Sequence, residues 1–102
     1  FIAHNTLINT AGIDVRDEKA SALAFGNHLE GTARARKGGT LKLEMNEIGN
    51  MRDFFSDPDR FALTWKRLPE KIPSHKYVSE DICRRPRSEG TLPGALEANG
   101  PC

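Results

Sequence analysis

The chain has 102 residues, of which 15 are Lys or Arg and 14 are Asp or Glu, for a formal net charge of +1. This length suits one domain and leaves no room for a second hydrophobic core. Near balance of charge disfavours a dedicated nucleic-acid binder, and no run of about 18 apolar residues is present to span a membrane. We therefore expect a soluble single domain.

The first fifteen residues mix apolar and small polar types. Leu7-Ile8 and Ile13/Val15 are the expected buried points on either side of a turn at Ala11-Gly12, which predicts a short pair of strands. The first residue is Phe1 instead of Met. We expect a processed or trimmed product, or a fragment of a longer protein.

Residues 17–36 have the composition and spacing of a helix. Ala22, Phe25, Leu29 and Ala33 recur at steps of three and four residues, which predicts one buried face. Acids at the start and the cations Arg34, Arg36 and Lys37 at the end suit the helix dipole, and a glycine follows where a helix would stop.

Residues 40–45 alternate between apolar and charged side chains, which predicts a half-buried strand. Asn46 can cap a helix through Phe55, and Ser56 can cap a further helix through Leu68. In residues 61–68 the apolar positions also fit a strand, so both assignments stay open, with helix favoured. After an extended connector between Pro69 and Pro73, we expect a last short helix that ends near residue 84.

Trp65 is the only Trp in the chain. A lone Trp that shares one face with Phe61 and Leu68 is more often a core residue than a ligand or partner anchor. We therefore predict that Trp65 lies in the core, with partner binding as the alternative.

Residues 84–102 are rich in Arg, Pro and Gly and contain no aromatic residue. Such a segment buries too little surface to offset its ordering entropy, which predicts a flexible tail. A bridge between Cys83 and Cys102 would close a loop across it. The alternative is two unpaired thiols, which suits a reducing compartment and slightly favours the cytoplasm.

These elements predict an α+β fold. About three helices pack on a two- or three-stranded sheet in residues 1–83, and residues 84–102 form the flexible tail.

No catalytic, cofactor-binding or metal motif is recognisable, so we expect no catalytic residues, no cofactor and no metal. The three histidines, His4, His28 and His75, lie in separate segments instead of at the close spacings typical of metal ligands. The nearest approach to a functional signal is two basic clusters, whose cations could contact phosphates or an acidic partner. They comprise Arg34, Arg36, Lys37 and Lys42, and Arg84, Arg85 and Arg87.

The first hypothesis is a small non-enzymatic protein-interaction module, a subunit or accessory piece of a larger assembly that docks through its tail and exposed apolar side chains. A protein partner or larger complex is expected. The alternative is a module that contacts nucleic acid through the two basic clusters, and a second alternative is a small enzyme subunit.

Overall fold

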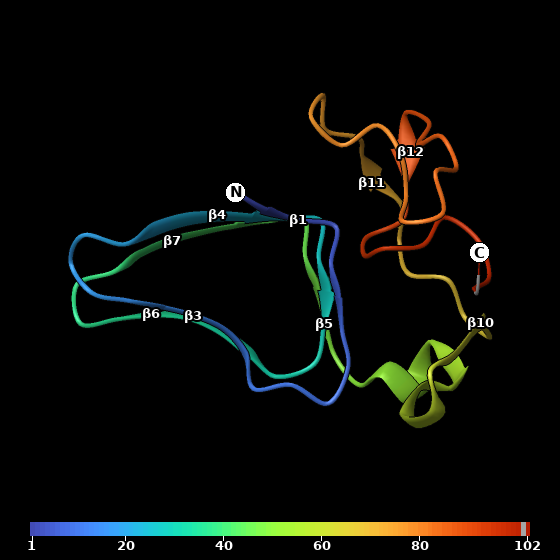
Figure 1. The fold of residues 1–102 in the computed structure, drawn as a ribbon, viewed down its shortest axis with the longest axis horizontal. Coiled ribbons are helices and arrows are strands. Elements are labelled where there is room, and N and C mark those ends of the chain that lie inside the picture. Colours follow the sequence, from blue (N-terminus) through green and yellow to red (C-terminus); the bar gives the residue numbers. More distant parts are fainter. Residues whose placement is uncertain (101) are drawn as a thin grey trace.

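The computed structural model describes residues 1–100 and 102, and its regular elements are almost all strands (Figure 1). The first eight strands form three successive turns of chain. They are β1 (Ile2–Ala3), β2 (Thr6–Leu7) and β3 (Gly12–Arg16), then β4 (Ser21–Phe25), β5 (His28–Leu29) and β6 (Thr32–Arg36), then β7 (Thr40–Glu44) and β8 (Glu47–Ile48).

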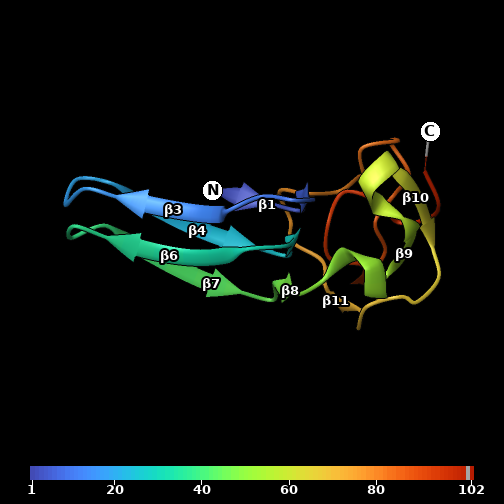
Figure 2. The same cartoon turned by 90° about the horizontal axis from the view of Figure 1, so that it is seen from below.

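These three turns are the coils of a parallel β-solenoid. Strand β4 pairs in parallel with β1 on one edge and with β7 on the other, β5 lies likewise between β2 and β8, and β3 pairs in parallel with β6. The register places Ile2 beside Ala24 and Ala24 beside Leu43, so the two steps are 22 and 19 residues long. Figure 2 shows the coils stacked side by side.

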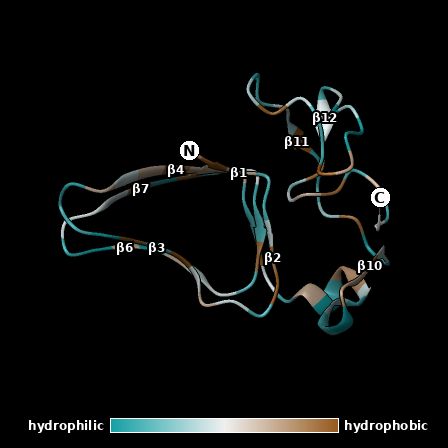
Figure 3. Cartoon of the chain, in the orientation of Figure 1, coloured by the Kyte–Doolittle hydropathy of each residue, from teal (hydrophilic) through white to brown (hydrophobic). Residues whose placement is uncertain are grey.

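Alternation within the strands fills the solenoid interior. In β3, Ile13 and Val15 are buried while Asp14 and Arg16 are exposed, because successive side chains of a strand point to opposite faces. Ala24 and Leu29 complete the buried cluster, and smaller or partly buried residues pack around it. In Figure 3 the hydrophobic colour follows β4, and the turn after β3 is hydrophilic.

The strands β1, β4 and β7 form the first wall of the solenoid, and β2, β5 and β8 form the second. The corner between these two walls repeats in every coil. His4, Gly26 and Met45 adopt left-handed backbone, with φ of 52°, 66° and 56°, and an asparagine follows each of them. The amides of Asn5, Asn27 and Asn46 form a hydrogen-bonded ladder along the stack. Gly26 also has no room for a side chain, since a Cβ there would lie 2.8 Å from Nε2 of His4.

The remainder of the chain forms a second unit beside the solenoid. It begins with the 3-10 helix η1 (Met51–Asp53), then β9 (Phe55–Asp57), the 3-10 helix η2 (Pro58–Arg60) and β10 (Ala62–Trp65), which pairs antiparallel with β9. Strands β11 (Ile72–Pro73) and β12 (Gly90–Thr91) form a second antiparallel pair.

The second unit has an apolar cluster of its own, formed by Met51, Phe54 and Phe55 with Trp65 packed against it, so the described residues hold two apolar clusters where the length of the chain predicted a single core. The ring of Trp65 lies 4.2 Å from that of Phe55 between centroids and is partly buried, whereas Phe61 and Leu68, which were predicted to share its buried face, are 72% and 56% exposed. A disulfide joins Cys83 to Cys102, and thus the bridged alternative is the one present. The two free thiols that favoured the cytoplasm are absent.

The predicted α+β fold with three helices is wrong. Residues 17–36 form β4, β5 and β6 instead of a helix, and residues 46–55 form β8 and η1. Residues 57–68 contain only the three-residue η2 before β10, so of residues 61–68 the strand alternative held for Ala62–Trp65, and residues 74–84 form mainly turns. The strand predicted at residues 40–45 is β7.

The helix prediction for residues 17–36 failed because their alanines are compatible with either a helix or a strand. Inward-facing alanines at two-residue intervals, such as Ala22 and Ala24, satisfy a strand as well as a helix. Gly31 suits the solenoid, because its φ there is 97° and a Cβ would lie 2.5 Å from the Ala11 carbonyl carbon in the neighbouring coil. No helix among residues 1–100 and 102 is long and apolar enough to cross a membrane.

Candidate functional site

The first basic cluster lies on β6, β7 and the turn between them. Arg36 forms an ion pair with Asp14 on the neighbouring coil, and this bond holds the pKa of the Asp14 carboxyl below its ordinary value. Lys42 is paired with Glu44 at 2.9 Å. Within residues 1–100 and 102, Arg34 and Lys37 form no ion pair, so two of the four cations remain unneutralised by a direct partner.

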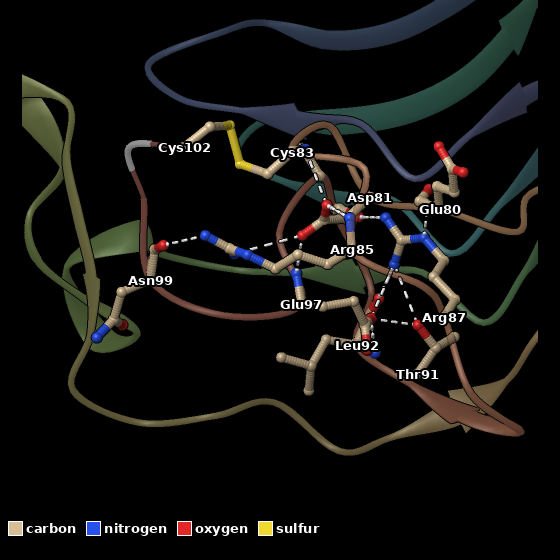
Figure 4. Close-up of polar contacts among 12 residues, drawn as sticks. Glu80, Asp81, Cys83, Arg85, Arg87, Thr91, Leu92, Glu97, Asn99 and Cys102 are labelled. Carbon is tan, nitrogen blue, oxygen red and sulfur yellow. Dashed lines mark hydrogen bonds and ion pairs between the residues drawn. A yellow bond between two sulfur atoms is a disulfide. The ribbon is translucent and has the colours of Figure 1, made fainter.

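Two arginines of the second cluster are engaged within the protein (Figure 4). The Arg87 side chain is only 1% exposed and forms an ion pair with Glu97 at 2.9 Å. It also donates to the carbonyl oxygens of Glu80, Leu92 and Gly94 and to the Thr91 hydroxyl at 2.9–3.1 Å. Arg87 therefore organises the surrounding loops and cannot reach an external phosphate in this conformation.

Asp81 is a second buried charged residue that hydrogen-bonds to the loops around Arg87. Its carboxylate accepts backbone hydrogen bonds from Cys83, Arg85 and Glu97 at 2.8–2.9 Å and an ion pair from the Arg85 side chain at 3.4 Å. Burial alone would raise the pKa of Asp81, but these donors together hold it below its ordinary value. Arg85 donates also to the Asn99 carbonyl.

The segment expected to be a flexible tail buries a row of side chains in this structure. Thr91, Leu92, Pro93 and Leu96 are buried around the Arg87 network. Of the three arginines in the segment, Arg84 is the exposed one.

The two basic clusters do not form one surface. Figure 1 places the turn between β6 and β7 at one end of the long axis and the segment around β12 toward the other. That axis is 39 Å long. A single nucleic-acid groove lined by all seven predicted cations is therefore not present in this arrangement.

The histidines lie in apolar surroundings. His28 is fully buried against Phe54, Phe55 and Trp65, and burial lowers its pKa from 6.5 to about 4. Burial, with the nearby Arg87 charge, also lowers the pKa of His4. Among residues 1–100 and 102, no group of three or more His, Cys, Asp or Glu side chains could hold a metal ion.

A further candidate surface is the end of the solenoid at the third coil, which we call the open end. It consists of the unpaired edges of β7 and β8 and the apolar side chains next to them. Leu43 is 46% exposed, Ile48 is 47% exposed and Met45 at the corner between them is 53% exposed. Inward-facing positions elsewhere in the stack, such as Ala24 and Leu29, are fully buried.

A groove borders the open end at its corner. It has a volume of about 360 Å³ and lies between the turn Met45–Glu47 and the connector Glu70–Pro73. Its lining is mixed, with apolar Met45 and Ile72 beside the acids Glu47 and Glu70 and the cation Lys71.

Sequence reasoning did not identify this surface, although the sequence holds a signal for it. The motif Asn-x-Leu/Ile occurs at Asn5, Asn27 and Asn46, once in each coil. Each motif combines a ladder asparagine with an apolar residue on the second wall.

The fold and its surfaces define the class of protein: a short parallel β-solenoid with an open terminal coil, followed by a disulfide-closed unit. Comparison with protein-family models, with curated proteins and with solved structures found no match for the chain.

Proposed function

We propose that the chain is a small protein-interaction module, a subunit or accessory piece of a larger assembly, and that it docks through the open end. The supporting observation is the exposure of Leu43, Met45 and Ile48 beside two strand edges that no described residue pairs. A solenoid normally needs a polar terminal repeat to remain monomeric, because an uncapped end exposes its core and unpaired backbone groups.

The composition of the open end favours a protein over a nucleic acid. Three large apolar side chains gather there, and among the residues that line the adjoining groove the acids Glu47 and Glu70 outnumber the one cation, Lys71. Exposed apolar surface of this kind is typical of protein interfaces. The cations that suggested nucleic acid lie elsewhere or are engaged within the protein.

The test uses the intact chain as bait in a lysate of its source cells. We expect Leu43→Lys/Ile48→Lys to abolish capture of the partner, because two buried charges would oppose docking. The matched control, Leu68→Lys/Ile82→Lys, changes two exposed aliphatic residues outside the open end and should leave capture unchanged. Equal capture by both double variants would contradict the proposal.

A nuclease-treated half of each sample separates the alternatives. A partner that disappears with the nucleic acid would favour the nucleic-acid module. An enzyme that persists after nuclease treatment and is lost with Leu43→Lys/Ile48→Lys would make the chain an accessory subunit of that enzyme.

A further inference from the structure

The hydrogen bonds at the solenoid corner indicate what kind of segment can occupy the open end. Each ladder asparagine is bonded to the next in a fixed sense. The backbone N–H of Asn5 donates to Oδ1 of Asn27 at 2.9 Å, and the N–H of Asn27 donates to Oδ1 of Asn46, also at 2.9 Å. The side-chain amides of Asn27 and Asn46 donate back to carbonyls of the preceding coil, those of Ile2 and Ala24.

The backbone on either side of the ladder repeats as well. The N–H of His4 donates to the Phe25 carbonyl, and one coil later the N–H of Gly26 donates to the Glu44 carbonyl, both at 3.1 Å. The corner of each coil thus presents two N–H groups to the coil that follows it.

At the third coil this series ends with its donors unused. Within residues 1–100 and 102, the N–H groups of Met45 and Asn46 donate no hydrogen bond, although their counterparts in both earlier coils do. In Figure 2 no other segment lies beyond β7 on the side away from β4. The open end therefore offers a specific pair of donors together with an apolar floor.

We propose that the open end binds a strand–asparagine–strand segment of a partner protein, which adds to β7 and β8 in parallel as one further coil. The asparagine of that segment would accept from the Asn46 N–H through its Oδ1 and donate to the Leu43 carbonyl, which continues the ladder by one step. This inference rests on the proposed docking function and names the chemistry of the partner.

The register specifies the remaining side chains of the partner segment. Residues that stack on Leu41, Leu43 and Ile48 face the solenoid interior and are apolar. The residue directly after the asparagine stacks on Glu47, as His28 does one coil earlier. Glu47 is the register neighbour of this position, and the two acids that line the groove, Glu47 and Glu70, outnumber its one cation, Lys71, so a Lys or Arg is favoured here. Extension of a sheet edge by a partner strand is a general mode of peptide recognition.

The chain itself supplies a probe. A synthetic peptide with the sequence of residues 20–29 carries the apolar alternation and the ladder asparagine of a natural coil, and His28→Lys within the peptide adds the cation. Titration of the isotope-labelled full-length protein, followed by amide chemical shifts, should move the resonances of Met45 and Asn46 with saturation below 1 mM. Asn27→Ala in the peptide should weaken binding about ten-fold, and His28→Glu in place of His28→Lys should weaken it similarly.

No saturation up to 1 mM, shifts centred outside residues 40–48, or equal binding of the Asn27→Ala peptide would each overturn the inference. Its failure can be told from failure of the proposed function. Loss of partner capture by Leu43→Lys/Ile48→Lys with no peptide binding would leave docking at the open end intact and reject only the continued ladder.

Discussion

Stability of the protein should fall on mild acidification because His28 folds as a neutral imidazole. Its side chain is fully buried against Phe54, Phe55 and Trp65, and neither ring nitrogen has a hydrogen-bond partner among the described residues. The folded-state pKa is about 4, whereas the unfolded chain has the ordinary value of 6.5. Between these two pH values the unfolded state binds a proton that the folded state excludes.

The size of this loss in the free energy of unfolding follows from the difference between the two pKa values of His28. Each pH unit between the two pKa values corresponds to about 1.4 kcal/mol, so the full effect is about 3 kcal/mol by pH 4. About 2 kcal/mol of it should be lost between pH 7.5 and pH 5. Asp14, Asp59 and Asp81 have lowered pKa values, and their contributions are lost only as the pH falls below about 4.

The assay is urea unfolding at a series of pH values, with His28→Leu as the comparison. The variant removes the titrating group at similar volume, so its free energy of unfolding should depend less on pH between 7.5 and 5, by about 2 kcal/mol. His4 also has a lowered pKa and contributes equally to both proteins. The same loss in wild type and His28→Leu would refute the reasoning, as would an NMR titration that gives His28 in the folded protein a pKa near 6.5.

Three further changes test the contacts that hold the fold. Asn27→Ala removes the middle of the ladder and leaves the Asn5 N–H unpaired, so the free energy of unfolding measured with urea should fall by about 3 kcal/mol. Arg87→Met leaves Glu97 without its ion-pair partner in a largely buried site, and thermal unfolding should show that the free energy of unfolding falls by about 3–5 kcal/mol. Cys83→Ser opens the loop to Cys102, which should cost about 3 kcal/mol by loop entropy and increase proteolysis within residues 84–100.

Strand β7 could be predicted from sequence because its alternation is unambiguous, with Leu41 and Leu43 on one side and Lys42 on the other. Residues 17–36 could not, since alanine fits both helix and strand and carries little directional information. The repeat that would have decided the matter is short and unevenly spaced. Coils of 22 and 19 residues hide the Asn-x-Leu/Ile motif from a search for a fixed period.

The basic clusters show a different limit of sequence reasoning. Nothing in the run from Arg84 to Arg87 distinguishes the exposed Arg84 from Arg87, which is buried against five acceptor groups. Those acceptors are mostly backbone carbonyls of loops that close only in the folded chain. Composition predicts how a segment behaves when its polar groups face water, and here a single arginine supplies the internal hydrogen bonds that water would otherwise provide.

The open end results from the same residues that stop the solenoid. After β8 the Gly49 N–H still bonds to the Leu29 carbonyl, but Asn50 then caps η1 by accepting from the Arg52 N–H. Met51 is drawn into the cluster with Phe54 and Phe55 and is fully buried there. If the chain continued from β8 into a strand that paired with β6, Met51 would leave this cluster. The burial of the Met51 side chain alone stabilises the second unit by about 2 kcal/mol. Burial of Met51 therefore favours the incomplete coil, and the edge left exposed is the one to which we propose that a partner strand adds.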